Sequence, residues 1–264
     1  MSSACESVSR QSKSLEQTEH RPWPAPKSMW LLGQSWLNLL FAHWPVGRAQ
    51  LESHVPRPLE LETFRGEAWI TVSPFLVEAL RLAATPPLPI LSRFPELNVR
   101  TYVTCEGKPG IWFLSLDAGS RSAVFGARRF YRLPYFHAEM RVAPRTNGSI
   151  EYESRREDGR GRAARFSAVY SPYGNPSTAA AGSLDHFLVE RYCLYSCSST
   201  GSLFRAEIHH RPWQLQPAEA EITTNTMLPP ALQLKAERPL LQFAARQDVV
   251  VWKPTRISTS PAES

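Results

Sequence analysis

The sequence predicts an α+β fold in which many short antiparallel strands dominate and a few short helices lie at the periphery. The chain has 23 prolines against 13 glycines. Because proline ends helices and is excluded from central strands, the elements between prolines should be short. Roughly ten segments have strand-like composition, which is too many for a helix bundle and too regularly spaced for two domains.

Strand and helix patterns follow one another through the first half of the chain. Each expected strand is a run of β-branched, aromatic or alternating apolar residues, and each break falls on Pro, Gly or a charged turn. Residues 81–95 carry four prolines and should form a loop. The other expected elements are a strand over residues 34–44, a short helix over 47–55, a hairpin of strands 59–64 and 68–77, and a second hairpin of strands 96–104 and 111–117.

The second half of the chain continues in the same way. Ser120 can cap a helix that runs to about Leu133, and Ser183 can begin another short helix. The buried side of the first of these helices should carry Val124, Ala127, Phe130 and Tyr131. The remaining expected strands cover residues 136–142, 149–154, 164–170, 192–198, 203–210 and 248–253.

The expected strand over residues 96–104 has two chemically different faces, because successive side chains of a strand point in opposite directions. Buried polar groups need hydrogen-bond partners, so the polar face should look at water or into a polar cavity. The apolar face carries Leu97, Val99, Thr101 and Val103, and the polar face carries Glu96, Asn98, Arg100, Tyr102 and Thr104.

The chain should form one domain between two unstructured ends. Residues 1–20 contain no apolar run, which excludes a secretory signal peptide and predicts a disordered leader. Residues 21–255 hold all the expected elements, and residues 256–264 should form a frayed tail. The most apolar window, residues 29–46, is interrupted by polar side chains and falls short of the ~20 apolar residues that span a bilayer. No membrane partner is therefore expected.

Charge and cysteine content limit the functional classes. The net charge is +6, but the one dense basic stretch, between Arg155 and Arg165, is interrupted by acidic residues and glycines. This pattern is typical of a solvated hairpin tip, so nucleic-acid binding is not expected. Four scattered cysteines favour reduced thiols in the cytoplasm. Neither zinc-ligand spacing nor a glycine-rich phosphate loop is present, so no metal and no cofactor is expected.

Five stretches along the chain carry a family resemblance: QSWLNLLFAHWPV, GEAWITVSPF, FPELNVRTYV, ARRFYRLPYF and LDHFLVERYCLY. They resemble the YqjF-like family of uncharacterised conserved proteins, and the resemblance covers roughly residues 20–255. It implies an antiparallel β-barrel of the acetoacetate decarboxylase type with a closed central cavity. It implies no known reaction.

Two segments can be compared with acetoacetate decarboxylase residue by residue. In FPEL, Glu96 stands at the position of an active-site carboxylate of that enzyme. In GARRFYRLPYFHAEM, Pro134 aligns with the proline of the enzyme's Gly-aromatic-Pro-Lys-Lys motif, so Tyr135 stands where the Schiff-base lysine is expected. A Schiff base needs a primary amine. The resemblance therefore implies a protein that does not use this covalent chemistry.

Three residues are candidates for the site. Glu96 can be a general acid or base, or a member of a solvent-facing row paired with Arg100. Arg100 is a candidate anchor for a ligand carboxylate. Tyr135 can donate a hydrogen bond to a bound carbonyl, or it can be a buried tyrosine satisfied by the protein. His209 and His210 should point to opposite faces of a strand, which excludes one shared metal ion.

Three functions are compatible with these residues. The leading hypothesis is a protein that binds a small carbonyl- or carboxylate-containing molecule in the barrel cavity without covalent chemistry. The second is a non-covalent acid/base enzyme, lyase-like or hydrolase-like, that uses Glu96 and Arg100. The third is a surface interaction module, which is favoured if side chains fill the cavity. The sequence leaves the ligand and the oligomeric state open.

Overall fold

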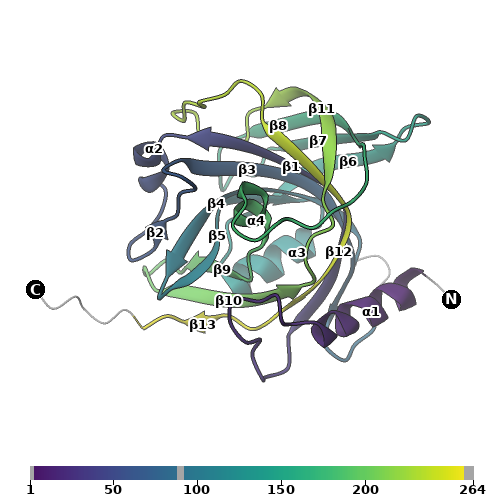
Figure 1. The fold of residues 1–264 in the computed structure, drawn as a ribbon, viewed down its shortest axis with the longest axis vertical. Helices are drawn as coiled ribbons and strands as arrows, with labels where there is room; N and C mark the ends of the chain where they lie inside the picture. The colour runs from purple at the N-terminus through teal and green to yellow at the C-terminus, as the bar shows by residue number, and fades with distance from the viewer. Residues whose placement is uncertain (1–2, 88–91, 259–264) are drawn as a thin grey trace, which may run out of the picture.

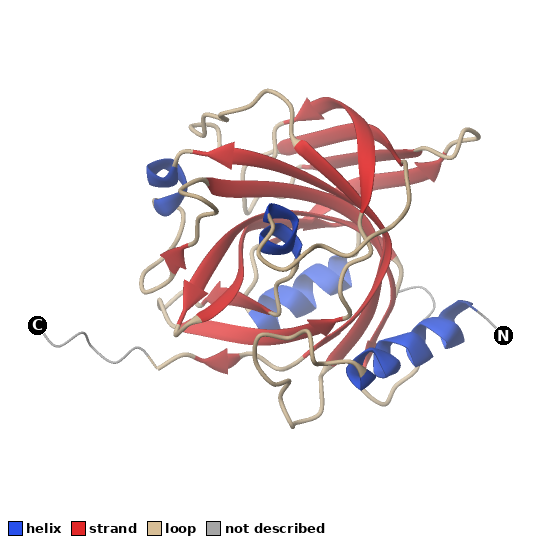
Figure 2. Cartoon of the chain, viewed as in Figure 1, coloured by secondary structure: helices blue, strands red, loops and turns tan. Residues whose placement is uncertain are grey.

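The computed structural model describes residues 3–87 and 92–258, and the strands of these residues form one strongly curved sheet with short helices around it (Figures 1 and 2). The helical elements are α1 (Ser3–Lys13), the 3₁₀ turn η1 (Ser14–Glu16), α2 (Arg48–Glu52), α3 (Arg121–Gly126), the π-helical turn η2 (Ala127–Tyr131) and α4 (Leu184–Val189). The strands are β1 (Leu32–Val46), β2 (Glu60–Leu61), β3 (Ala68–Leu82), β4 (Phe94–Cys105), β5 (Lys108–Ala118), β6 (Tyr135–Pro144), β7 (Ile150–Arg156), β8 (Ala164–Pro172), β9 (Cys193–Cys197), β10 (Leu203–His210), β11 (Gln216–Asn225), β12 (Leu240–Val251) and β13 (Thr255–Arg256).

The sheet closes on itself as a ring. Strand pairing runs from β12 through β1, β3, β4, β5, β9 and β10 and returns to β12. Most neighbouring strands are antiparallel, whereas β5 pairs in parallel with both β6 and β9. The α+β class, with predominantly antiparallel strands and a few short peripheral helices, is therefore confirmed.

The remaining long strands form a second layer outside the ring (Figure 1). Strands β6, β7, β8 and β11 leave the ring at β5 and rejoin it at β12. One hydrophobic core, which includes Leu40, Val99 and Phe166, lies between this layer and the ring. A second cluster, which includes Phe41 and Phe75, lies on the opposite face of β1 and β3. Because side chains alternate along a strand, the same strands serve both the core between the layers and the interior of the ring.

The expected hairpin of residues 59–64 and 68–77 is wrong in its pairing. Glu60 of β2 lies opposite Thr104 of β4, and only Phe64 and Glu67 bridge the turn before β3. The turn residues predicted a turn correctly, but the partner of β2 is set by a contact more than 40 residues away along the chain. Strand β11 and the first part of β12 were not expected. Apolar and polar residues alternate along β11, but its Ala and Glu residues have low strand propensity.

The helix expected after Ser120 is present but changes character halfway. The Ser120 side chain accepts a hydrogen bond from the Ala123 backbone N–H at 3.3 Å, which confirms the cap. From Ala127 onward the backbone is π-helical. A π-turn holds more residues than an α-turn and so rotates the following side chains. Phe130, which was expected on the buried side, is 60% exposed, and this part of the prediction is wrong.

The amino-terminal leader, expected to be disordered, is helical in α1 and η1; α1 packs on β1, β3 and β12, and η1 packs on β10. The docked face is polar. Buried Gln11 donates from Nε2 to the Ala79 carbonyl at 3.2 Å and accepts from Arg81 Nε at 2.8 Å. In the tail, Arg256 belongs to β13 and Ile257 is buried, which corrects the expectation of fraying there; residues 259–264 lie outside the described part. Polar contacts of this kind leave no apolar run in the sequence from which they could be predicted.

Replacing Gln11 with Ala is expected to lower the free energy of unfolding by about 1–3 kcal/mol, because buried Arg81 loses an acceptor and the Ala79 carbonyl loses a donor. Urea denaturation of the full chain measures this change. Gln17→Ala, at an exposed position four residues after α1 ends, is the control. Equal effects of the two substitutions would show that the helix contributes nothing through Gln11.

The arginine-rich β7–β8 connection is only partly a solvated tip. Arg155 and Arg160 are exposed, as expected. Arg156 is buried instead, with Nε 3.2 Å from Oδ1 of the fully buried Asp117. This is a charge contact without hydrogen-bond geometry, and it joins the end of β7 to the ring strand β5.

Candidate functional site

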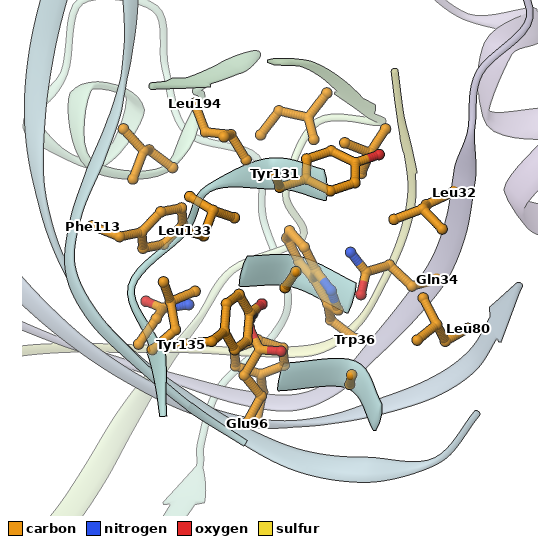
Figure 3. A pocket seen from close by; sticks show the side chains of 18 of the residues that line it. Leu32, Gln34, Trp36, Leu80, Glu96, Phe113, Tyr131, Leu133, Tyr135 and Leu194 are labelled. Atoms are coloured by element: carbon orange, nitrogen blue, oxygen red, sulfur yellow. Dashed lines mark hydrogen bonds between the residues drawn. The ribbon is translucent and has the colours of Figure 1, made fainter. Parts of the chain in front are cut away.

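A cavity of about 430 Å³ lies inside the ring. Its walls are mostly apolar, which is usual for small-molecule sites that use a few polar groups to orient a ligand. The side chains labelled in Figure 3 include Leu32, Trp36, Leu80, Phe113, Leu133 and Leu194 among the apolar ones, and Gln34, Glu96, Tyr131 and Tyr135 among the polar ones.

Exposed residues among the cavity lining mark its mouth. Leu82 ends β3, Thr85 and Pro86 follow it, and Phe130 lies on η2; all are exposed and all line the cavity. The mouth therefore lies between the end of β3 and the α3–η2 segment.

Glu96 and Tyr135 meet on the cavity wall (Figure 3). The Tyr135 hydroxyl donates to Glu96 Oε1 at 2.9 Å. Glu96 belongs to β4, and its backbone carbonyl accepts a hydrogen bond from the buried Tyr152 hydroxyl at 2.6 Å. Tyr135 begins β6, and its carbonyl accepts from Arg128 Nη1 at 2.8 Å. Each partner is thus held on a different strand by its own backbone contact.

Burial dominates the electrostatics of this pair. The Glu96 side chain is in an apolar surrounding that disfavours its charged form, and this raises its pKa to about 8 although the Tyr135 hydrogen bond acts in the opposite direction. Burial, and then the neighbouring Glu96, raises the pKa of Tyr135 well above its ordinary value. At neutral pH the pair is therefore mainly a carboxylic acid next to a phenol, and it can offer a proton to a ligand oxygen.

Arg100 lines the same cavity, two strand positions beyond Asn98 and four beyond Glu96. Its side chain is 5% exposed and packs against the Phe41 ring, with the guanidinium carbon 5.2 Å from the ring centre. Nη2 donates to the Leu188 carbonyl at 3.3 Å, and Nε has no partner among the described residues. No carboxylate in the described part forms an ion pair with Arg100. The structure thus places Glu96, Arg100 and Tyr135 along one cavity, but Arg100 is about 13 Å along the strand from Glu96.

Three further polar groups on the lining have no hydrogen-bond partner among the described residues. They are Asn98 Oδ1, the Tyr131 hydroxyl and Trp213 Nε1. Asn98 was expected in the polar row and Tyr131 on a buried helix face, but neither residue was among the candidates for the site. Nothing in the local sequence indicated Trp213, which follows β10 and reaches the cavity from a loop.

The histidines do not form a metal site. His210 lines the cavity and contacts the Arg191 and Arg211 carbonyls, whereas His209 contacts the Ser14 carbonyl from the opposite face of β10. Across the described residues, no group of three or more His, Cys, Asp or Glu side chains is arranged to hold a metal ion. None of the helices described is both long and apolar enough to cross a bilayer.

Comparison with known proteins identifies the family. Residues 33–248 match the DUF2071 family, described as "Uncharacterized conserved protein". The chain belongs to this family. It is also 45% identical to the uncharacterized protein YqjF of Bacillus subtilis (strain 168) over 238 residues, which cover 90% of this chain and 97% of that protein. The resemblance to the YqjF-like family is thereby confirmed.

Solved structures with the same fold include enzymes of the acetoacetate decarboxylase type. The acetoacetate decarboxylase of Legionella pneumophila has a TM-score of 0.58 and 13% identity, with coverage of 90% of this DUF2071 chain and 93% of that one. The enduracididine biosynthesis enzyme MppR, solved in complex with pyruvate, has a TM-score of 0.62 and 12% identity, with coverage of 91% and 93%. At these identities the likeness shows the fold alone.

The five lysines of this DUF2071 chain lie away from the cavity. They are Lys13, Lys27, Lys108, Lys235 and Lys253, and none belongs to the lining among the described residues. Lys108 pairs with Glu207 at 3.3 Å and Lys235 pairs with Glu67 at 2.6 Å. Tyr135 lines the cavity, and its hydroxyl contacts Glu96 there.

Proposed function

We propose that this protein binds a small carbonyl- or carboxylate-containing molecule in the ring cavity without forming a covalent bond to it. A cytoplasmic location is part of the proposal, and free Cys105, Cys193 and Cys197 thiols support it. The open cavity argues against the surface interaction module, which a cavity filled by side chains would favour.

The observation that carries the proposal is the state of Arg100. A buried guanidinium retains its charge, and burying a charge without a partner is costly. Nη2 of Arg100 donates to a neutral carbonyl, the Tyr102 ring lies beside the guanidinium, and Nε has no hydrogen-bond partner among the described residues. Burial lowers the pKa of Arg100; Tyr102 opposes this shift, and the neighbouring Arg191 adds a smaller repulsion. A ligand carboxylate supplies the missing negative charge and can accept two hydrogen bonds from the guanidinium.

The Glu96–Tyr135 pair supplies a second contact of different chemistry. Because the pKa of Glu96 is about 8, its protonated carboxyl can donate to a ligand carbonyl at neutral pH. The mostly apolar lining of the cavity suits a ligand with a hydrocarbon body. MppR, which has the same fold, was solved with the keto acid pyruvate, which carries both polar groups on adjacent carbons; a ligand that contacts Arg100 and the Glu96–Tyr135 pair together needs a longer body.

The second candidate function is a non-covalent acid/base enzyme, and the raised pKa of Glu96 favours it, because a general acid works best when its pKa lies near the operating pH. Glu96 would transfer the proton and Arg100 would hold the substrate carboxylate. Turnover that is lost in Glu96→Gln, with the fold intact, distinguishes this enzyme from a binding protein.

Arg100→Met is expected to weaken binding of keto acids by about 10–100-fold, because a charged hydrogen bond contributes about 1.5–3 kcal/mol. Native mass spectrometry of freshly purified full-length protein first tests for a co-purified molecule. Titration with pyruvate, acetoacetate and phenylpyruvate then follows the fluorescence of Trp36 and Trp213, which line the cavity. The control is Arg121→Met, at an exposed position outside the cavity. Equal binding by both variants, or no binding at all, contradicts the proposal.

A further inference from the structure

A second pocket lies outside the ring where the sheet divides. Along one edge β5 pairs with β9 at Ile111 and Trp112, and then with β6 at residues 116–118. In the part of the chain that the structure describes, no strand pairs with residues 113–115 on that edge. A pocket of about 730 Å³ opens at this gap, lined by residues of β5, β6, β9 and the η2 segment.

Two arginines without ion-pair partners line this pocket. Arg128 lies on η2, and Arg132 is the residue after it, in the left-handed conformation with φ 57°. Such a backbone is costly for a residue other than glycine, and π-turns are frequent at functional sites. Neither Arg128 nor Arg132 forms an ion pair with a described residue. A third arginine, Arg160, donates from Nε to Asp158 at 2.7 Å, so its charge is already compensated.

An aromatic ring lies close to each of the two unpaired guanidinium groups. The Arg132 guanidinium carbon lies 3.9 Å from the centre of the Phe204 ring, and that of Arg128 lies 5.8 Å from the centre of the Phe136 ring. Arg128 also donates from Nη1 to the Tyr135 carbonyl. Arg132 donates from Nη1 to the Phe130 carbonyl at 3.4 Å. Each guanidinium has five N–H donors, so further donors remain for a ligand.

An independent observation comes from Ser196 of β9. This serine is 2% exposed and lines the pocket, and its hydroxyl has no hydrogen-bond partner among the described residues. A buried hydroxyl without a partner is unfavourable. Ser198 and Ser199 also line the pocket, and no Asp or Glu does so among the described residues. The polar part of the pocket therefore offers donors and positive charge to an oxyanion.

The rest of the lining is aromatic or apolar and indicates the body of the ligand. Trp112 and Phe113 of β5 and Phe136 of β6 are partly accessible in the pocket. Its volume exceeds what a bare inorganic anion fills, and aromatic side chains favour flat ring systems through stacking.

We propose that this pocket binds a phosphate monoester with a flat, ring-containing body. Arg128, Arg132 and the Ser196 hydroxyl hold the phosphate oxygens, and the aromatic side chains of β5 and β6 contact the ring system. The proposal for this pocket does not depend on the proposal for the keto-acid site. The two sites are neighbours, since Phe113 and Leu133 line both the pocket and the ring cavity, and Arg128 donates a hydrogen bond to the Tyr135 carbonyl.

Isothermal titration of the full chain at low salt tests the proposal with 1-naphthyl phosphate and adenosine 5′-monophosphate. At least one of them should bind. Inorganic phosphate and the corresponding phosphate-free compound should each bind at least about tenfold more weakly than that ester. Arg132→Gln should weaken binding by about tenfold or more, and Ser196→Ala by several-fold.

Arg155→Gln is the matched control, because Arg155 is an exposed arginine already paired with Glu139 and Glu157. It should bind like the native chain. A melting temperature close to the native one confirms that Arg132→Gln is folded. Arg128→Lys provides a second variant, which keeps the positive charge and loses the planar guanidinium that can donate two parallel hydrogen bonds. The proposal is overturned if neither probe binds, if phosphate alone binds as well as the esters, or if Arg132→Gln and Arg155→Gln bind equally.

Discussion

Glu96→Gln is expected to stabilise the protein at neutral pH by about 3 kcal/mol, an order-of-magnitude value from a pKa of about 8 against an ordinary value of 4.5. The carboxyl group is 6% exposed in an apolar cavity. Gln keeps an oxygen that accepts the Tyr135 hydrogen bond, fills nearly the same volume and carries no charge that burial penalises. A stabilising substitution on the wall of a cavity is the expected signature of a residue whose role is functional and not structural.

The expected stabilisation by Glu96→Gln depends on pH, because Glu96 has different pKa values in the folded and unfolded states. Between about pH 4.5 and pH 8 the folded protein keeps the Glu96 proton while the unfolded chain has lost it. The folded state therefore binds more protons, and its stability falls as the pH rises through this window. Gln does not titrate. The advantage of Glu96→Gln should consequently be small near pH 4.5, grow with pH, and level off above about pH 8.

Urea denaturation of both proteins across this pH range measures the difference. The control is Glu219→Gln, at an exposed position on β11, which should leave the pH profile unchanged. A Glu96→Gln variant that is less stable than the native protein at every pH would show that the carboxyl group is ionised and stabilised in the folded state, and the description of a neutral Glu96–Tyr135 pair would then be wrong.

The features predicted best from the sequence depend on short-range regularities. The polar row that begins at Glu96 follows from the two-residue alternation of a strand, and the same alternation places Asn98 and Arg100 on the cavity lining. The caps at Ser120 and Ser183 also depend on neighbours three residues away. These features needed no knowledge of which strands pair.

The features that were missed depend on contacts between distant segments. Helix α1 docks through Gln11 to residues near position 80, and its own composition contains no sign of that surface. Trp213 faces the cavity because of the path of a loop. The gap in pairing along β5 exists because β6 and β9 diverge. Each of these arrangements is a property of the closed ring and not of any one segment.

The combined substitution Tyr135→Lys and Glu96→Gln is expected to create a Schiff-base nucleophile where the native protein has none. Position 135 lies on the cavity wall, and burial that raises the pKa of Tyr135 should lower that of a lysine at the same place, which leaves more free amine near neutral pH. With Glu96 intact, the carboxylate would hold the new lysine protonated. The second substitution removes this effect.

The chemistry can be followed by trapping. The new amine adds to the keto carbon of acetoacetate and water leaves, which forms an imine. Borohydride then delivers hydride to the imine carbon and fixes the adduct as a secondary amine. Intact-protein mass spectrometry should show this adduct on the double variant, and peptide mapping should place it at position 135. The native chain, whose five lysines lie outside the cavity lining, should give only background labelling.

Tyr173→Lys is the matched control, because Tyr173 is 54% exposed and a lysine there keeps its ordinary pKa and stays protonated near neutral pH. It should not exceed the native background. An adduct at one defined lysine of the native chain would mean that the nucleophile lies elsewhere and that covalent chemistry belongs to this protein. Absence of an adduct on a folded double variant would mean that the keto acid does not reach the Glu96–Tyr135 wall, and the ligand would then be held at Arg100 without a carbonyl contact.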